Sequence, residues 1–280
     1  MAERAYSPHW WQDLEDEALQ EMMNPPYTGD DGLLYCSTCK TPKQRRHKTE
    51  DGREYLVYMD CECHKRAKRL RLFREMQSGI TDDRAKGATF AKDDGADREN
   101  SLLLRRYAEK WDDMQRENIG LLLHGDVGGG KTFFAACIAN AIIEKAVKEG
   151  REHPVPIMLT TIPALRDEMQ RDFGAKKARI LREIAETPLL ILDDIGFEKT
   201  TPTAAELAFD IINQRYKANA PLIVTTNLTI SEITNAQDMQ QKRIFDRIVE
   251  MCSPVYIKAE GRRQAIARDK SAEARRILGI

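Results

Sequence analysis

One eight-residue stretch, Gly125–Thr132, carries residue types that could bind a nucleoside triphosphate. Its sequence matches the phosphate-loop pattern G-x-x-x-x-G-K-[ST]. Glycines let successive backbone N–H groups approach phosphate oxygens, because no Cβ stands in the way. We expect Lys131 to reach the β- and γ-phosphates of ATP and the Thr132 hydroxyl to ligate Mg²⁺. The predicted nucleotide contacts are Gly125, Asp126, Val127, Gly128, Gly129, Gly130, Lys131, Thr132 and Phe133.

The residues around this loop predict the elements that must position it. An apolar run at residues 119–124 indicates a buried strand, and residues 133–148 have the pattern of a helix that ends before Gly150. The N-terminus of that helix would add its positive end to the phosphate site. A glycine-rich turn that matches by chance is the alternative, and the order of strand, loop and helix argues against it.

Two further apolar runs end in residues suited to ATP hydrolysis. Residues 188–192 precede Asp193 and Asp194, and residues 221–226 precede Asn227. Open α/β sheets bind ligands at the carboxyl ends of their strands. We expect Asp193 to hold Mg²⁺, mainly through water, and Asp194 to orient or deprotonate the attacking water. Asn227 would position the same water, unless it only begins the next turn.

Arginines late in the chain could complete the site. Arg243 and Arg247 lie four residues apart, hence on one face of a predicted helix. Hydrolysis builds negative charge, and the arginine that stabilises it often comes from a neighbouring subunit. Arg262 and Arg263 follow a predicted strand at 255–258 and could reach the phosphates of their own subunit. Ordinary surface arginines are the alternative.

Four of the six cysteines form two close pairs, Cys36-x-x-Cys39 and Cys61-x-Cys63. Close pairs separated by a loop are typical of structural zinc sites, which gather four soft ligands. Disulfides are disfavoured in a reducing cytosol. The spacing therefore predicts a zinc site of four cysteines, with His64 or His47 replacing one of them as the alternative.

Composition limits the class of protein. The chain has 280 residues, of which 41% are hydrophobic and 32% charged, as expected for a globular α/β domain with a small accessory module. No apolar run approaches the roughly 18 residues of a membrane span, and the N-terminus lacks a secretory signal pattern. We therefore expect a cytoplasmic protein without a membrane partner. The net charge of −1 does not indicate nucleic-acid binding. Basic stretches at 40–74 and 258–280 could meet phosphate or form solvated faces.

The patterns divide the chain into four parts. Residues 1–31 predict an amphipathic helix that either docks a partner or packs on its own zinc module. Its apolar face carries Trp11, Leu14, Ala18 and Met22. Residues 32–77 would form the zinc-binding module, 78–118 a linker and a leading helix, and 119–280 the ATPase core. Alternating strands and helices predict an α/β fold of three layers with a mostly parallel sheet.

Together these motifs resemble the AAA+ ATPases of the DnaC/DnaI type, the bacterial and phage loaders of the replicative DNA helicase. The resemblance rests on the phosphate loop, on Leu-Leu-Ile-Leu-Asp-Asp-Ile-Gly-Phe-Glu, on Ile-Ile-Asn-Gln-Arg-Tyr and on Ile-Val-Thr-Thr-Asn-Leu. It covers roughly residues 78–268. The N-terminal cysteine pairs also resemble the zinc-binding, helicase-docking domain of some members.

The resemblance implies roles for individual residues and the cofactors ATP, Mg²⁺ and Zn²⁺. The implied roles are Walker A for Lys131 and Thr132, Walker B for Asp193 and Asp194, sensor 1 for Asn227, trans-acting arginine finger for Arg247, and cis sensor 2 for Arg263 within one residue of register. Only 22 residues follow Lys258, which implies a P-loop AAA+ core without a full C-terminal lid. Many AAA+ proteins have Asp-Glu at the Walker B pair, so the second, shorter carboxylate implies slow hydrolysis.

The implied function is ATP-dependent loading of the replicative helicase onto single-stranded DNA during replication initiation. The helicase would bind residues 1–75, single-stranded DNA would bind the assembled ATPase domains, and those domains would self-associate. One alternative is an AAA+ transposition helper, a class that usually resembles the ATPase core alone. The other is a zinc-bearing, ATP-binding adaptor with little turnover.

Overall fold

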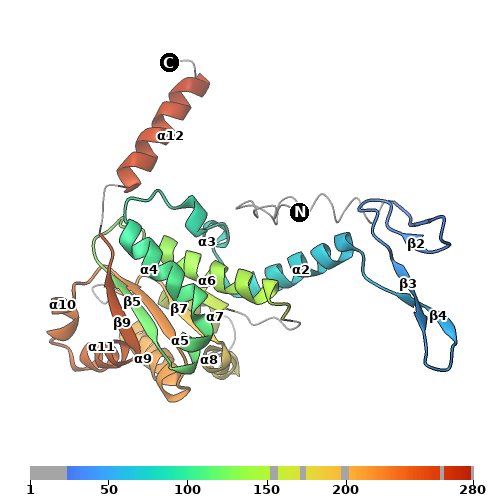
Figure 1. Cartoon of the computed structure of the whole chain (residues 1–280). Coiled ribbons are helices and arrows are strands. Elements are labelled where there is room, and N and C mark those ends of the chain that lie inside the picture. The colour runs from blue at the N-terminus through green and yellow to red at the C-terminus, as the bar shows by residue number, and fades with distance from the viewer. Residues whose placement is uncertain (1–23, 152–156, 171–174, 197–201, 259–261, 279–280) are drawn as a thin grey trace. The chain divides into compact units, whose positions relative to one another are not determined.

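The computed structural model describes residues 24–151, 157–170, 175–196, 202–258 and 262–278. The chain divides into two compact units, residues 1–75 and 76–280 (Figure 1). Most of the amphipathic helix predicted at residues 1–31 lies outside the described residues. Among the described helices, none combines the length and the apolar content that a bilayer crossing requires.

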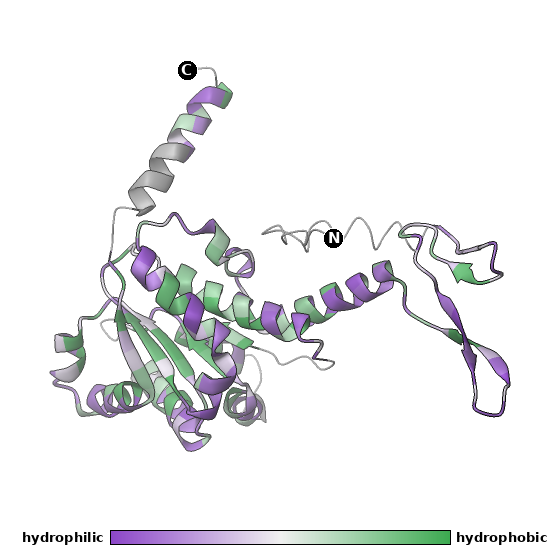
Figure 2. Ribbon diagram, viewed as in Figure 1, coloured by the Kyte–Doolittle hydropathy of each residue, from purple (hydrophilic) through white to green (hydrophobic). Residues whose placement is uncertain are grey.

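The first unit is a small β module followed by a helix. β1 (Tyr27–Thr28) pairs antiparallel with β2 (Leu34–Tyr35), and β3 (Gln44–Lys48) pairs antiparallel with β4 (Glu54–Tyr58). α2 (Glu62–Met76) follows and is mainly hydrophilic (Figure 2). Among the described residues of the β module, the buried cluster consists of cysteines and not of the aliphatic side chains that usually stabilise a domain.

The second unit is built on a five-stranded parallel sheet in the order β6-β7-β8-β5-β9. The strands are β5 (Gly120–His124), β6 (Ile157–Thr160), β7 (Leu189–Leu192), β8 (Leu222–Thr226) and β9 (Cys252–Tyr256). In the pairing register, His124 lies opposite both Thr226 and Tyr256, so the carboxyl ends of β5, β8 and β9 meet at one edge. The loops after these strands therefore share one site.

Helices cover both faces of this sheet, which explains why its central strands β7, β8 and β5 are buried along almost their whole length. On one face α6 (Lys131–Lys148) packs with α4 (Arg98–Glu109). On the other, α9 (Pro202–Lys217) packs with α7 (Ile162–Gln170), α8 (Ala175–Glu186) and α11 (Met239–Met251). The remaining helices are α5 (Trp111–Arg116), α10 (Ile230–Thr234) and α12 (Arg262–Leu278). Apolar residues concentrate in the sheet and in α6 (Figure 2).

The segment that composition suggests is a linker carries short helices packed on α6 and β6 of the second unit. These are η1 (Gln77–Gly79), α3 (Asp83–Lys86) and η2 (Phe90–Lys92). Asn140 of α6 holds the segment, because its buried amide donates to the carbonyls of Ala85 and Ala88, each at 2.8 Å, and accepts from Gln77 at 2.7 Å. This set of bonds ties the segment to the helix that follows the phosphate loop.

Arg215 is a fully buried arginine that anchors the C-terminal end of α9. Its guanidinium donates to the carbonyls of Ile184 and Thr187 at 2.8 and 2.5 Å, to that of Pro188 at 3.2 Å, and to that of Pro221. These carbonyls belong to the end of α8 and to the starts of β7 and β8. Desolvation lowers the pKa of Arg215 to about 10, which leaves it charged at neutral pH. One side chain thus joins three chain segments.

Candidate nucleotide-binding and zinc sites

The phosphate loop connects β5 to α6, and three of its glycines, Gly125, Gly128 and Gly130, have backbone angles that other residues rarely adopt. Gly125 has φ of +129°, and a Cβ there would lie 2.4 Å from the carbonyl oxygen of Ile257. Gly130 is the left-handed N-cap of α6, with φ of +93°. In the described part of the chain no side chain caps this helix. The loop therefore presents backbone N–H groups and a helix N-terminus, which favour an anion.

Lys131 is buried and lies across this loop. Its Nζ donates to the carbonyls of Gly125 and Asp126, at 2.8 and 2.7 Å. Burial, and then the positive charge of Lys131, lowers the pKa of His124 at the end of β5. His124 is therefore neutral at physiological pH, and its ring lies 5.5 Å from that of Tyr256. Lys131 therefore places a positive charge at the phosphate loop.

Thr132 and Asp193 meet although they are far apart in sequence. The Thr132 hydroxyl donates to the two carboxylate oxygens of Asp193 at 2.9 and 3.1 Å. The Thr225 hydroxyl, buried in β8, donates to Oδ1 of Asp193 at 2.6 Å. Hydroxyl and carboxylate oxygens are the donor set that Mg²⁺ prefers. Thr132 and Asp193 therefore offer oxygen atoms that fit Mg²⁺.

Asp194 and Asn227 also come together, because β7 and β8 are neighbours in the sheet. The Asn227 amide donates to Oδ1 of Asp194 at 3.1 Å. Asp194 has a left-handed backbone, with φ of +55°, and its N–H donates to the Thr225 hydroxyl at 2.8 Å. Such a conformation costs energy for a residue other than glycine and is held by its surroundings. Here the bonds to β8 direct the exposed carboxylate to Asn227.

Sequence reasoning missed two residues that support this site. Thr225 bonds to both Asp193 and Asp194. The sequence feature that could have indicated this role is a threonine near the end of the strand next to the acid pair. The Tyr256 hydroxyl donates to Oδ2 of Asp126 in the phosphate loop at 3.3 Å. Its position at the end of β9 follows from the strand order, which sequence patterns do not determine. Of the remaining predicted contacts, Val127 is exposed, and Phe133 is half-buried against the ring of its neighbour.

The predicted arginines are placed differently. The guanidinium of Arg247, on α11, lies 4.7 Å from the ring centroid of Phe209 and 5.6 Å from that of Tyr216. Within the described residues, no hydrogen bond or ion pair joins Arg247 to the phosphate loop or to the acid pair. Arg263 lies in the first turn of α12, and its side chain is outside the described part.

The four paired cysteines form one cluster. The Sγ atoms of Cys36, Cys39, Cys61 and Cys63 all lie within 4.8 Å of one another. Burial opposes ionisation of Cys39, but hydrogen bonds to Thr41 and Cys63 outweigh it and lower the pKa of Cys39 to about 6. Burial, followed by hydrogen bonding to Cys39, raises the pKa of Cys63. Four convergent sulfurs are compatible with a tetrahedral zinc site.

Neither candidate histidine joins this cluster. The His64 side chain is 57% exposed and turns to Asp60, with Nε2 at 3.7 Å from Oδ1. The His47 ring packs on Tyr55 at 5.1 Å, within the β3–β4 hairpin. The arrangement therefore favours four cysteines over a histidine replacement.

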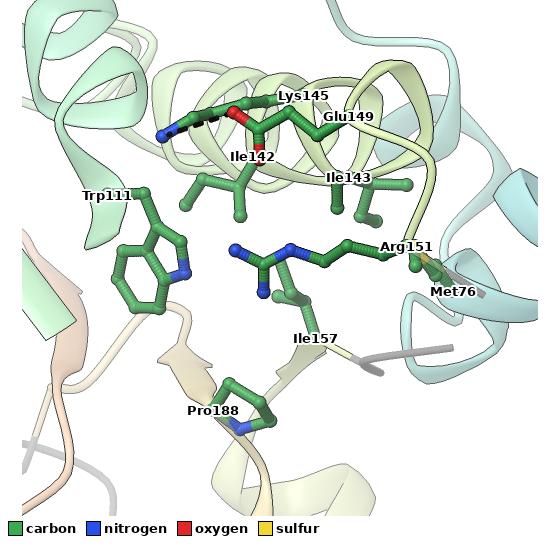
Figure 3. Close-up of a pocket in the computed structure, with 10 residues that line it drawn as sticks. Met76, Trp111, Ile142, Ile143, Lys145, Glu149, Arg151, Ile157 and Pro188 are labelled. Atoms are coloured by element: carbon green, nitrogen blue, oxygen red, sulfur yellow. Dashed lines mark ion pairs between the residues drawn. The ribbon is translucent and has the colours of Figure 1, made fainter. Parts of the chain in front are cut away.

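Two hollows elsewhere in the second unit do not fit a nucleotide. One is a cavity of about 10 Å³ beside α6, where Trp111, Ile142 and Arg151 point toward one another (Figure 3). A volume of this size holds one water at most. The other is a groove of about 520 Å³ beside β6, lined by Glu168, Glu183 and other residues, whose acidic side chains would repel phosphate.

The comparisons with known proteins agree with this geometry. A family model described as IstB-like ATP binding protein matches residues 100–271, more than half of the chain. The replicative helicase loader DnaI of Bacillus subtilis is 22% identical over 273 residues, which cover 89% of this chain and 85% of the relative. An ATP-binding protein of insertion sequence IS5376 from Geobacillus stearothermophilus is 30% identical over 118 residues, 42% of this chain and 43% of the relative.

A solved structure also resembles the chain. The crystal structure of DnaI superposes with a TM-score of 0.53 at 25% identity, over 69% of this chain and 99% of that one. The matched family model lies wholly within the second unit, where the phosphate loop, the acid pair and the parallel sheet occur together. This chain therefore belongs to the family of IstB-like ATP-binding proteins.

Proposed function

We propose that this protein is an ATP-dependent loader that delivers a replicative DNA helicase to single-stranded DNA. The observation that carries the proposal is the extent of the similarity to the loader DnaI. An alignment over 89% of 280 residues leaves about 31 residues outside, fewer than the 75 residues of the first unit. The similarity therefore extends beyond the ATPase core into the unit that holds the cysteine cluster.

In the proposed site, Lys131 and the loop N–H groups bind the phosphates of ATP. Thr132 and Asp193 hold Mg²⁺, which would neutralise charge on the β- and γ-phosphates. Asp194, with Asn227 as its hydrogen-bond donor, orients the attacking water. Arg247 acts on the nucleotide of a neighbouring copy, and Arg263 on that of its own. The short second carboxylate favours slow turnover, which suits ATP as a switch of subunit packing.

In the proposed assembly, the first unit docks the helicase and zinc stabilises that unit. ATPase domains of successive copies associate, and their shared surface binds single-stranded DNA through backbone contacts and stacking, which tolerate any base sequence. The proposed role does not involve a membrane.

The test uses the full chain, a replicative helicase and single-stranded DNA. We expect the helicase to be retained by the wild-type protein and its transfer to DNA to require ATP. Lys131→Ala should lower ATP affinity by about tenfold or more, because charge-assisted bonds to phosphate are lost, while helicase binding persists. Lys148→Ala, at the other end of α6, is the matched control. If the wild-type chain does not bind the helicase, the loader proposal is wrong.

A transposition helper is the second candidate, because the matched family is named for an IstB-like protein and an insertion-sequence protein is among the relatives. Activation of a transposase on DNA, without helicase binding, would favour it. ATP binding without turnover, with and without single-stranded DNA, would instead favour a zinc-bearing adaptor.

A further inference from the structure

The run at residues 211–216 contributes to the resemblance between this chain and the helicase loaders. Among the described residues, no hydrogen bond or ion pair joins it to the nucleotide site described above. Its last two residues point in different directions. Arg215 is buried and fixes the end of α9, whereas Tyr216 is 40% exposed. Phe209 lies seven residues before Tyr216, so the two aromatic rings share one face of α9. Phe209 and the last residue of the run, Tyr216, therefore form an aromatic face on α9.

Arg247 of α11 rests on this aromatic face. Its guanidinium lies over both rings, at 4.7 and 5.6 Å from their centroids. Its Nη1 is buried without a hydrogen-bond acceptor. Among the described residues no carboxylate pairs with it. Arg247 is thus a half-buried cation held by π faces.

Two acids near Arg247 are engaged by other groups. Glu250, three residues further along α11, accepts from the Tyr216 hydroxyl at 2.9 Å. This bond raises the pKa of Tyr216, so the hydroxyl stays protonated and remains the donor. Asp210, beside Phe209, pairs with Lys177 at 2.8 Å. Neither of these two carboxylates forms an ion pair with Arg247.

We propose that Phe209 and Tyr216 are positioning residues that hold Arg247 ready for an anion on a second copy of this chain, the triphosphate in its phosphate loop. This inference rests on the trans role of Arg247 in the proposed function. A carboxylate partner would neutralise the arginine and would have to be displaced by phosphate. An aromatic face attracts the guanidinium but leaves its net charge intact. A held side chain also loses less conformational entropy when the second copy binds.

A double-mutant cycle tests this role. Phe209→Leu and Tyr216→Leu should each lower ATP turnover of the assembled full chain about three- to tenfold, because each removes one ring from the guanidinium. ATP affinity of the monomer should not change. Tyr216→Phe keeps the ring and should retain most of the turnover. In an Arg247→Ala background, the two leucine variants should cause no further loss.

The controls separate positioning from folding. Lys217→Ala removes an exposed charge from the same turn of α9 and should leave turnover unchanged. Thermal melting shows whether each variant is folded, and Tyr216 is exposed enough for its replacement to be tolerated. Losses that add to that of Arg247→Ala, or leucine variants with wild-type turnover, would overturn the proposal.

A second measurement is independent of catalysis. The Nε–H signal of Arg247 in a nitrogen-15 NMR spectrum, identified by its loss in Arg247→Ala, should carry a ring-current shift. Tyr216→Leu should move this signal toward the position of an exposed arginine, and Lys217→Ala should not. If Arg247→Ala leaves turnover unchanged, the trans role fails while the NMR shift still reports the aromatic contact. A signal that Tyr216→Leu does not move would overturn the positioning role itself.

Discussion

At the scale of single residues, the Asp193 carboxylate is the point on which the nucleotide site converges. It accepts from Thr132 of α6 and from Thr225 of β8, and its own N–H donates to the Thr160 carbonyl at 2.8 Å. Three elements thus fix one acid. A ligand whose rotamer is held in this way loses little entropy when a cation binds.

Replacing Thr225 tests this arrangement. Thr225→Val keeps the shape of the side chain but removes the hydroxyl that holds Asp193 and the backbone of Asp194. We expect ATP affinity in the presence of Mg²⁺ to fall about three- to tenfold, since one hydrogen bond to a charged group is lost, with a smaller change when Mg²⁺ is chelated. Calorimetric titration measures both. Thr226→Val is the matched control, because the Thr226 hydroxyl donates to the Ile195 carbonyl and not to the acid pair. Equal losses in the two variants would contradict the role of Thr225.

At the scale of elements, the ends of α8, α9, β7 and β8 are joined by Arg215. The residue lies in the run Ile-Ile-Asn-Gln-Arg-Tyr, which sequence reasoning associates with the helicase loaders but to which it assigns no chemistry. The described residues give Arg215 no carboxylate partner, and backbone carbonyls with partial negative charge take the donors of its Nη1 and Nη2 instead. Its removal would leave several buried acceptors unpaired.

Arg215→Met should therefore destabilise the second unit strongly. We expect about 3–5 kcal/mol, because several buried carbonyls lose their donor, and a fall in melting temperature of about 6–20 °C. Circular dichroism during heating measures this shift. Lys217→Ala, two residues away and exposed, should change it little. A melting temperature within a degree of wild type would show that Arg215 does not anchor α9.

At the scale of the whole molecule, the two units have different sources of stability. The second unit has buried aliphatic side chains on both faces of its sheet, whereas the buried cluster among the described residues of the β module is made of cysteines. A module of this kind usually needs a bound metal to fold. The two units should therefore respond separately to removal of zinc.

Cys36→Ser should release zinc and unfold the first unit while the second stays folded. We expect bound zinc to fall from about one ion per chain to nearly none, with ATP affinity unchanged, because the ligands of the two sites lie in different units. Elemental analysis and ATP titration measure the two effects. Cys252→Ala is the control, because Cys252 lies in the core of the second unit, and this variant should bind as much zinc as the wild type. Undiminished zinc in Cys36→Ser would argue against the four-cysteine site.

Local patterns in the sequence predicted the strands and helices, because these form through interactions between residues that are near one another in the chain. The parallel α/β architecture followed from alternating apolar runs and helical periodicity, and the comparisons support that class. The segment at residues 77–97 shows the limit of this reasoning. Its polar composition resembles a linker, yet buried bonds from Asn140, more than 50 residues away in the chain, hold it against α6.

By itself, the sequence determined that a phosphate loop, an acid pair and two cysteine pairs exist, because each depends on residues a few positions apart. Only the tertiary structure decided what supports them. Thr225 reaches Asp193 across 32 positions, and Arg215 reaches Ile184 across 31. Arg247 rests on rings of another helix. Such contacts depend on strand order and helix packing, which burial of the whole apolar surface selects and no short pattern encodes.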